Sequence, residues 1–359
     1  MLKQKKMIIL SIVLLLLLFT VGGCGKSTGN NKKKNEAESS VASLKIQNGS
    51  YVTSEGKANS KDHAALALSI SITNHTKESL DLYSGDFSLY DAKNQKVSAD
   101  NDIYDESDIF KTLESSDLSP RKTVTGNLIF DVAKGKTYEL HYQPDVYKGG
   151  KKTGEVILKF NTGKYKDPSA DVRQATDAYI QAVFFSNNTP AYSKYVANDP
   201  AKDQAIVKNA FTKDVSESFD DNWSKQQIDK VYKAYQAASR EKGGADVKVY
   251  SVFSTHATVE VVPKVLDFDS LSDDVETLKD QFIDDNQGKY SSYDAAVKAW
   301  YAYLADHIGE LFNKADAVPA DDSYKLNLSE HDGKWEINTD NSSANYDYQS
   351  LVHAMTGGY

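Results

Sequence analysis

The spacing of apolar residues changes at about residue 163, and this change most constrains the fold. Upstream, the stretch LALSISIT places Leu66, Leu68, Ile70 and Ile72 on one face of an extended chain. The stretches FSLYD, VTGNLIFDV and YELHY repeat this alternation, with turn-forming residues between them. Strict alternation is typical of half-buried strands. Several short strands without a helical stretch predict an antiparallel β sandwich over residues 44–163.

Downstream of Gly163 the apolar residues recur at helical spacing. Asp167-Pro168 is a typical helix start, and the first helix carries apolar residues from Val172 to Val183. Further helices are expected at 201–219, 224–241, 271–285 and 292–314. VKVYSVF and ATVEVVPKV predict paired strands, and SYKLNLSEHDGKWEIN predicts a hairpin that turns at its Asp-Gly pair. Residues 168–359 are therefore expected to form an α+β domain, with helices and a small antiparallel sheet.

The first 23 residues have the layout of a secretory signal peptide. Lys3, Lys5 and Lys6 precede the apolar run MIILSIVLLLLLF, which is short for a membrane-spanning helix. The following GKST also resembles the end of a phosphate-binding loop. That loop requires a glycine at position 20, where this chain has Thr20, and the polar tract after it does not predict a helix.

Val21-Gly22-Gly23-Cys24 resembles the lipobox of bacterial lipoproteins. The resemblance implies cleavage between Gly23 and Cys24 and lipidation of Cys24, which would hold the protein on the extracellular face of the cell membrane. Two or more acyl chains on one cysteine give stable anchoring, whereas one chain gives marginal binding. The alternative is an ordinary signal peptide with an incidental cysteine. Residues 24–43 are poor in apolar residues and are expected to form a disordered linker.

Charge and cysteine content exclude several classes of protein. Without residues 1–23 the chain has 39 basic and 51 acidic residues, a net charge of -12. Such an acidic chain has no electrostatic basis for binding nucleic acid. Its one cysteine is assigned to the lipid, so no internal disulfide is expected. No cofactor-binding motif is present, and no cofactor is expected.

The sandwich region also resembles a known family. ALSISITNHTKESLDLYSGDFSLYDAKNQKV and LSPRKTVTGNLIFDVAKGKTYELHYQP are similar to an immunoglobulin-like domain of Gram-positive lipoproteins, grouped with the immunoprotective extracellular protein family. The positions that match the pattern are Asn74, Phe87, Leu89, Asp91, Leu118, Pro120, Gly126, Phe130 and Val132. The resemblance implies a binding or structural module with no catalytic residues.

Two further resemblances concern the second domain. KLNLSEHDGKWEI is similar to the last hairpin of cystatin-like and nuclear-transport-factor-like cone folds. The pairing of the two domains resembles an uncharacterised lipoprotein family of Gram-positive bacteria, which brings no function with it.

A cluster of acidic residues suggests a calcium site in the sandwich. ADNDIYDESDIF brings Asp100, Asp102, Asp105 and Asp108 into one loop, and Ca²⁺ prefers such oxygen ligands. The spacing is not that of an EF-hand, and the alternative is a solvated acidic loop. The seven histidines form no zinc-binding pattern, so no other metal is expected.

Catalytic motifs are absent from the sequence, and no enzyme is expected. There is no Gly-x-Ser-x-Gly elbow, and an acylated Cys24 cannot serve as a nucleophile. Aromatic residues are the better guide to a site, because tyrosine and tryptophan are favoured at contact surfaces. The candidate ligand contacts are Tyr179, Phe184, Tyr192, Tyr195, Trp300 and Tyr301. The alternative interpretation is that they pack in the core.

The sequence therefore predicts a non-enzymatic, membrane-anchored surface lipoprotein. The expected role is that of a binding or adaptor module whose partner is an envelope protein, a peptide or a glycan. The alternative is a receptor for a small molecule or glycan, with its ligand in a cavity of the second domain. An enzyme that acts on the envelope is the third hypothesis.

Overall fold

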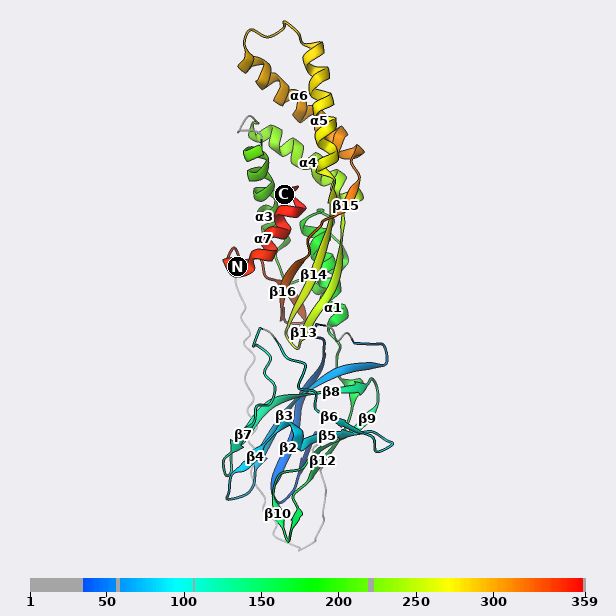
Figure 1. The fold of residues 1–359 in the computed structure, drawn as a ribbon, viewed down its shortest axis with the longest axis vertical. Coiled ribbons are helices and arrows are strands. Elements are labelled where there is room, and N and C mark those ends of the chain that lie inside the picture. Colours follow the sequence, from blue (N-terminus) through cyan, green and yellow to red (C-terminus); the bar gives the residue numbers. More distant parts are fainter. Residues whose placement is uncertain (1–34, 56–58, 106, 219–222, 358–359) are drawn as a thin grey trace, which may run out of the picture. The chain divides into compact units, whose positions relative to one another are not determined.

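The computed structural model describes residues 35–55, 59–105, 107–218 and 223–357 (Figure 1). The predicted signal peptide, the predicted cleavage site at Gly23 and the predicted lipidation site Cys24 lie outside the described residues. Residues 35–359 belong to one compact unit. In the part of the chain that the structure describes, no helix is both long and apolar enough to cross a bilayer.

Two four-stranded antiparallel sheets make up the first domain (Figure 1). The first sheet has the order β1(Glu36–Glu38), β2(Ala42–Val52), β3(His63–Asn74), β8(Thr123–Ala133). The second sheet has the order β12(Val156–Asn161), β9(Thr137–Tyr142), β5(Phe87–Tyr90), β6(Lys96–Ser98). Two short pairs complete it: β4(Leu80–Leu82) with β7(Ser116–Leu118), and β10(Tyr147–Lys148) with β11(Lys151–Lys152).

The core of this domain confirms the predicted alternation. Leu66, Leu68, Ile70 and Ile72 of β3 are each 0% exposed and pack with apolar residues of both sheets. In the second sheet, the rings of Phe87 and Tyr142 stack with their centroids 4.7 Å apart. Apolar residues two apart point to the same face, so both sheets turn a continuous apolar face toward one core.

The prediction of a disordered linker over residues 24–43 is wrong for its last eight residues. Glu36–Glu38 pairs with Ser43–Lys45 of β2, and Ala42 is fully buried. Val41 is buried as well and packs close to Gly154, whose φ is +83°. Strand pairing uses backbone groups, which the polar side chains of Glu36–Glu38 do not reveal.

Seven helices and a five-stranded antiparallel sheet form the described part of the second domain. The helices are α1(Ser169–Val183), α2(Pro190–Tyr195), α3(Pro200–Ser218), α4(Lys225–Lys242), α5(Phe268–Asp285), α6(Tyr293–Lys314) and α7(Tyr346–Met355). The sheet has the order β13(Gly244–Phe253), β14(His256–Leu266), β16(Tyr324–His331), β17(Lys334–Ile337), and β15(Ala317–Pro319) pairs with β14. The α+β prediction is confirmed, whereas α2, α7 and β15 had no counterpart in it.

The local signals that predicted these elements are present in the structure. Ser224 caps α4 in a reciprocal arrangement with Gln227, as a capping box does. Asp332 and Gly333 both have positive φ, 53° and 81°, which the two central residues of a type I′ hairpin turn require.

The space between helix and sheet is filled by large side chains. Tyr179 and Val183 of α1 pack with Trp335 of β17 and Tyr348 of α7, and each is less than 3% exposed. The hydroxyls of Tyr179 and Tyr348 are 2.9 Å apart. Core side chains therefore fill the space between α1, α7 and β17.

Candidate functional site

The tip of the β13–β14 hairpin is seated on the first domain. Phe253, which is 1% exposed, packs with Val52, Ala65, Ala67 and other apolar residues of the sandwich. The two alanines lie on the face of β3 that turns away from the sandwich core, and their small side chains leave room for the phenylalanine ring. Thr53 and Val252 exchange two backbone hydrogen bonds, at 3.0 and 2.8 Å. Apolar contact and strand pairing thus join the two domains.

An Asp–His pair closes the same contact. The Nε2 of His256, at the start of β14, lies 2.6 Å from Oδ2 of Asp105 in the acidic loop of the sandwich. The two side chains are only 14% and 5% exposed. Asp105 also accepts hydrogen bonds from the backbone N–H groups of Ser107, Ile109 and Phe110 and from the Ser107 hydroxyl.

The electrostatics of Asp105 follow from these contacts. Burial by itself raises the pKa of the carboxyl, but the hydrogen bonds from Phe110 and Ser107 and the neighbouring His256 outweigh it. The net effect holds the pKa of Asp105 below its ordinary value of 3.8. The carboxylate is therefore a fixed hydrogen-bond acceptor, well suited to hold the loop and the hairpin together.

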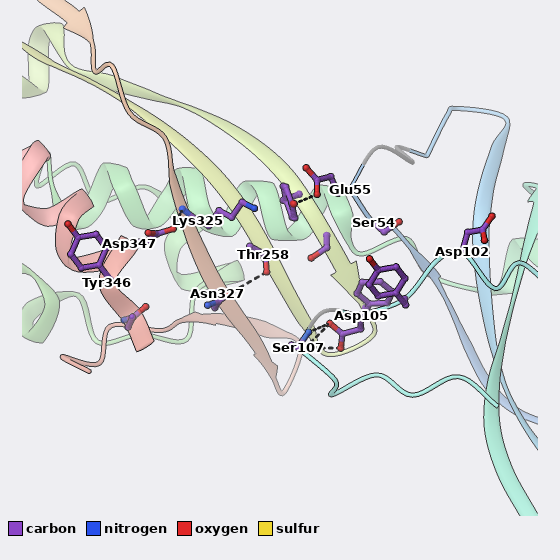
Figure 2. Close-up of a pocket in the computed structure, with 15 residues that line it drawn as sticks. Ser54, Glu55, Asp102, Asp105, Ser107, Thr258, Lys325, Asn327, Tyr346 and Asp347 are labelled. Carbon is purple, nitrogen blue, oxygen red and sulfur yellow. Dashed lines mark hydrogen bonds between the residues drawn. The ribbon is translucent and has the colours of Figure 1, made fainter. Parts of the chain in front are cut away.

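A polar cleft of about 590 Å³ opens beside this contact (Figure 2). Its walls come from both domains, with the acidic loop and residues 54–55 on the sandwich side and β13, β14, β16 and α7 on the other. Figure 2 shows Tyr346 and Asp347 of α7 at one end of the drawn site and Asp102 near the other, with Lys325, Thr258 and Asn327 between them. Because residues of both domains line one cleft, its shape depends on the contact between them.

Several residues that line the cleft contact one another through a cation–π contact and hydrogen bonds. The Nζ of Lys325 lies 3.7 Å from the centroid of the Tyr250 ring, and the Tyr250 hydroxyl donates a hydrogen bond to Glu55. The backbone N–H of Lys325 donates to Asp347 at 2.9 Å. Such a cation–π contact at an exposed site contributes about 0.5–1 kcal/mol. It therefore favours one position of the Lys325 side chain over others.

Two tyrosines of the cleft are turned to solvent. Tyr104 is 64% exposed and Tyr346 is 70% exposed, although both line the cleft. An exposed aromatic ring beside hydrogen-bonding groups provides an apolar face and a polar edge to one ligand. The sequence patterns do not predict Tyr104 or Tyr346 as site residues. Tyr104 nevertheless lies within the acidic stretch ADNDIYDESDIF, which was predicted to bind calcium.

The structure does not assemble the predicted calcium site. Asp105 is committed to the hairpin, Asp102 lies in the cleft, and Asp100 lines a different hollow. The carboxylate of Asp108 is 83% exposed and pairs with Lys111 at 3.3 Å. Within residues 35–357, leaving aside the undescribed gaps, no three His, Cys, Asp or Glu side chains are placed to hold a metal ion. The Asp105 carboxylate accepts hydrogen bonds from its own loop and contacts His256, so it is not available to share a metal ion with the other carboxylates.

The six aromatic residues predicted to contact a ligand differ in how deeply they are buried. Tyr179, Phe184 and Tyr192 are 0%, 4% and 8% exposed, so the ligand-contact prediction is wrong for them and core packing is the correct interpretation. Tyr195 is half-buried, and Lys194 donates to its hydroxyl at 2.6 Å. Trp300 and Tyr301 are partly buried against the helical core and are not among the residues that line the cleft.

Taken together, these features define a two-domain protein, an antiparallel β sandwich followed by an α+β domain. Residues 163–355 match the family described as "Domain of unknown function (DUF5105)", and residues 25–153 match "Domain of unknown function (DUF4352)". The first match covers more than half of the chain, and the protein belongs to the DUF5105 family.

One relative extends over both domains. The uncharacterised lipoprotein YcdA of Bacillus subtilis (strain 168) is 28% identical over 342 residues, which are 89% of this chain and 91% of that protein. The crystal structure of the B. subtilis ycdA lipoprotein aligns with a TM-score of 0.67 and 25% identity, over 90% of this chain and 99% of that one. This chain is thus homologous to a lipoprotein along nearly its whole length.

Proposed function

We propose that this protein is a non-enzymatic lipoprotein, anchored by Cys24 to the extracellular face of the cell membrane, that binds an envelope glycan in the interdomain cleft. The observation that carries the proposal is the joint presence of Tyr104 and Tyr346 in one polar cleft built from both domains. Sugar rings present apolar faces and hydroxyl-rich edges, which match exposed aromatic rings flanked by amides and carboxylates.

The charge of the cleft and of the whole molecule limits which glycans can bind. Among the described residues, the cleft contains the carboxylates of Glu55, Asp102, Asp105 and Asp347 and the ammonium group of Lys325. The whole mature chain is acidic as well, with 39 basic and 51 acidic residues after residue 23. Anionic wall polymers would be repelled by this field, whereas a neutral or amine-bearing glycan would not.

Anchoring is supported by two independent lines. Cys24 follows a signal-peptide pattern, and the relative that spans both domains is a lipoprotein. Acylation of Cys24 would keep the cleft close to the envelope and remove the need for high affinity in solution, because a tethered protein is already concentrated where its ligand is.

A binding role suits the buried carboxylate better than a catalytic one. A general acid needs a carboxyl whose pKa is raised toward neutrality. The cleft carboxylate at the domain contact, Asp105, has its pKa held below the ordinary value, after burial has been outweighed by hydrogen bonds from Phe110 and Ser107. At neutral pH Asp105 is therefore ionised, and its carboxylate accepts hydrogen bonds that join the acidic loop to the β13–β14 hairpin.

The test is calorimetric titration of the mature protein with a chitin oligosaccharide as the neutral probe. We expect Tyr104→Ala and Tyr346→Ala each to weaken binding about fivefold, because losing an aromatic contact costs roughly 1 kcal/mol and about 1.4 kcal/mol is tenfold. Tyr147→Ala is the matched control, since Tyr147 is also 60% exposed but belongs to the β10–β11 pair of the sandwich. If neutral and amino glycans fail to bind, or the cleft variants bind like the control, the proposal is wrong.

An adaptor role has separate support at the α5–α6 hairpin. Tyr293 and Ile283 are 83% and 47% exposed there, above an aromatic cluster of Phe282, Trp300 and Tyr303. Exposed aromatic residues over a rigid cluster favour contact with a protein. Proximity crosslinking in intact cells tests this role: an envelope protein captured by the wild type and lost with Tyr293→Ser would support it. Cys24→Ala provides the unanchored comparison.

A further inference from the structure

A second hollow lies in the helical part of the second domain, and it differs in character from the cleft. It has a volume of about 300 Å³ and is lined by Phe211 of α3, Trp223, Val231 of α4, Leu271 of α5, and Ile308 and Phe312 of α6. No residue that lines the cleft of Figure 2 also lines this pocket. The two hollows are therefore separate sites, and what is inferred for one does not depend on the other.

Most side chains that line this pocket are apolar, and several of them belong to the core. Val231, Phe211 and Phe312 are 1%, 2% and 3% exposed and belong to the core of the helical layer. Phe211 also stacks on Tyr235 with centroids 5.2 Å apart, which fixes the orientation of its ring. The indole N–H of Trp223 donates a hydrogen bond to the backbone carbonyl of Tyr301 at 2.7 Å, so the polar atom of this side chain already has a partner within the protein. A ligand would meet carbon surfaces that are already in place.

The size of the pocket sets the size of its ligand. An apolar cavity of about 150 Å³ lined by leucine, isoleucine and phenylalanine binds benzene. A pocket of about 300 Å³ has room for roughly twice that volume, at the lower end of the range of small-molecule sites. This corresponds to one or two aromatic rings, or to a short branched alkyl group.

The polar groups of the pocket define which ligands are excluded. Asp214 and Thr356 belong to its lining, and the Thr356 hydroxyl lies 3.3 Å from the Asp214 carboxylate. His353 Nδ1 lies 3.1 Å from the same carboxylate oxygen and holds it in place. A carboxylate at the pocket disfavours an anionic ligand, including the head group of a fatty acid, by charge repulsion and desolvation.

We infer that this helical pocket binds a small neutral apolar molecule of one or two aromatic rings. The ligand inserts between α3, α4, α5 and α6, with its rings against Phe211, Trp223 and Phe312. The site is a binding site without covalent chemistry, and the driving force is burial of apolar surface in a preformed pocket.

The experiment uses two probes that share one ring framework. 1-Naphthylamine has two fused rings and is neutral, whereas 8-amino-1-naphthalenesulfonate adds a sulfonate to the same rings. We titrate each into the full mature protein and follow energy transfer from tryptophan, since Trp223 lines the pocket. Saturable one-to-one binding of the neutral probe is expected, with the anionic probe at least tenfold weaker.

Two filling variants test the location. Val231→Phe and Val275→Phe place a ring in the pocket from α4 and α5, and each should weaken the neutral probe at least tenfold. Val231 is almost fully buried, so a phenylalanine there could prevent folding. Val275 is half-buried, and its variant is expected to retain the fold. Val318→Phe is the control, because Val318 is 39% exposed on β15 and does not line this pocket.

Each outcome decides the inference. Absence of saturable binding, equal binding of the two probes, or wild-type affinity in both folded filling variants would overturn it. If the probe binds here while chitin oligosaccharides do not bind the cleft, the helical pocket stands and the glycan proposal fails. The opposite result leaves the cleft as the site and removes the pocket.

Discussion

Substitution of Asp105 by alanine tests whether one carboxylate holds the domain contact. The change removes the acceptor of His256 Nε2 at 2.6 Å and of the Ile109 and Phe110 backbone N–H groups at 3.1 and 2.8 Å. It also releases Ser107, whose backbone N–H and hydroxyl both donate to the carboxylate. The acidic loop would lose the centre around which it folds.

The magnitude can be worked from these contacts. A hydrogen bond to a charged group contributes about 1.5–3 kcal/mol, and a donor left unsatisfied in a buried place costs a similar amount. The side chain of Asp105 is 5% exposed, so the penalty for its His256 contact is not relieved by water. Donors in the exposed part of the loop can turn to solvent and lose little. We therefore expect Asp105→Ala to lower the free energy of unfolding by about 3 kcal/mol.

The pH dependence has a defined sign. Because hydrogen bonds outweigh burial, the pKa of Asp105 is below 3.8 in the folded protein. Its stabilising contribution is then fully present above the unfolded pKa, and it is lost as the pH falls through the lower folded pKa. The difference between wild type and Asp105→Ala should shrink as the pH falls from about 5 to below about 4.

Denaturant unfolding of both proteins, repeated across this pH range, is the assay. Asp102→Ala is the matched control in the same loop, because Asp102 is exposed. The control should change stability by less than about 0.5 kcal/mol. If Asp105→Ala behaves like Asp102→Ala, the carboxylate does not hold the contact and the reasoning is refuted.

Three further substitutions test the packing. Gly154→Ala should lower stability by about 3 kcal/mol, because φ is +83° and a Cβ would lie 2.3 Å from Cγ2 of Val41; thermal melting measures this loss. Tyr179→Phe should cost about 1–2 kcal/mol in denaturant unfolding, since the buried Tyr348 hydroxyl loses its partner at 2.9 Å. Burial raises the pKa of Asp203 above 3.8, so its ionisation disfavours the fold. Stability of the wild type relative to Asp203→Asn should therefore fall as pH rises from about 3.8 through the raised pKa, and a flat difference would contradict this.

Local periodicity was sufficient for the elements that bury one face. The alternation in β3 and the 3.6-residue spacing in α4 are both local, so sequence alone placed them within a few residues. The pattern of α7 was also present: Tyr348, Leu351, Val352 and Met355 are its buried residues and follow helical spacing. Strand β1 carried no such signal, because Glu36–Glu38 joins the sheet through its backbone.

The site could not be predicted in the same way, since it depends on contacts between distant parts of the chain. Asp105 and His256 are 151 residues apart, and nothing local couples them. The carboxylates of the acidic loop were noticed for their chemistry, but their placement is decided by the hairpin tip that docks beside them. Ala65 and Ala67 gave the one available hint, because two small apolar residues on the outward face of a strand mark a place where another element approaches.

Docking of the β13–β14 hairpin and glycan binding in the cleft both depend on the contact between the two domains. The cleft exists only while the hairpin is seated, so the apparent affinity is the intrinsic affinity multiplied by the docked fraction. In Asp105→Ala the hairpin keeps the buried Phe253 and the two backbone hydrogen bonds between Thr53 and Val252. These contacts keep the docked fraction close to one even when about 3 kcal/mol of unfolding free energy is lost. Asp105 also holds the loop that carries Tyr104, so Asp105→Ala should still weaken glycan binding, to about the extent that Tyr104→Ala does, although the hairpin stays docked.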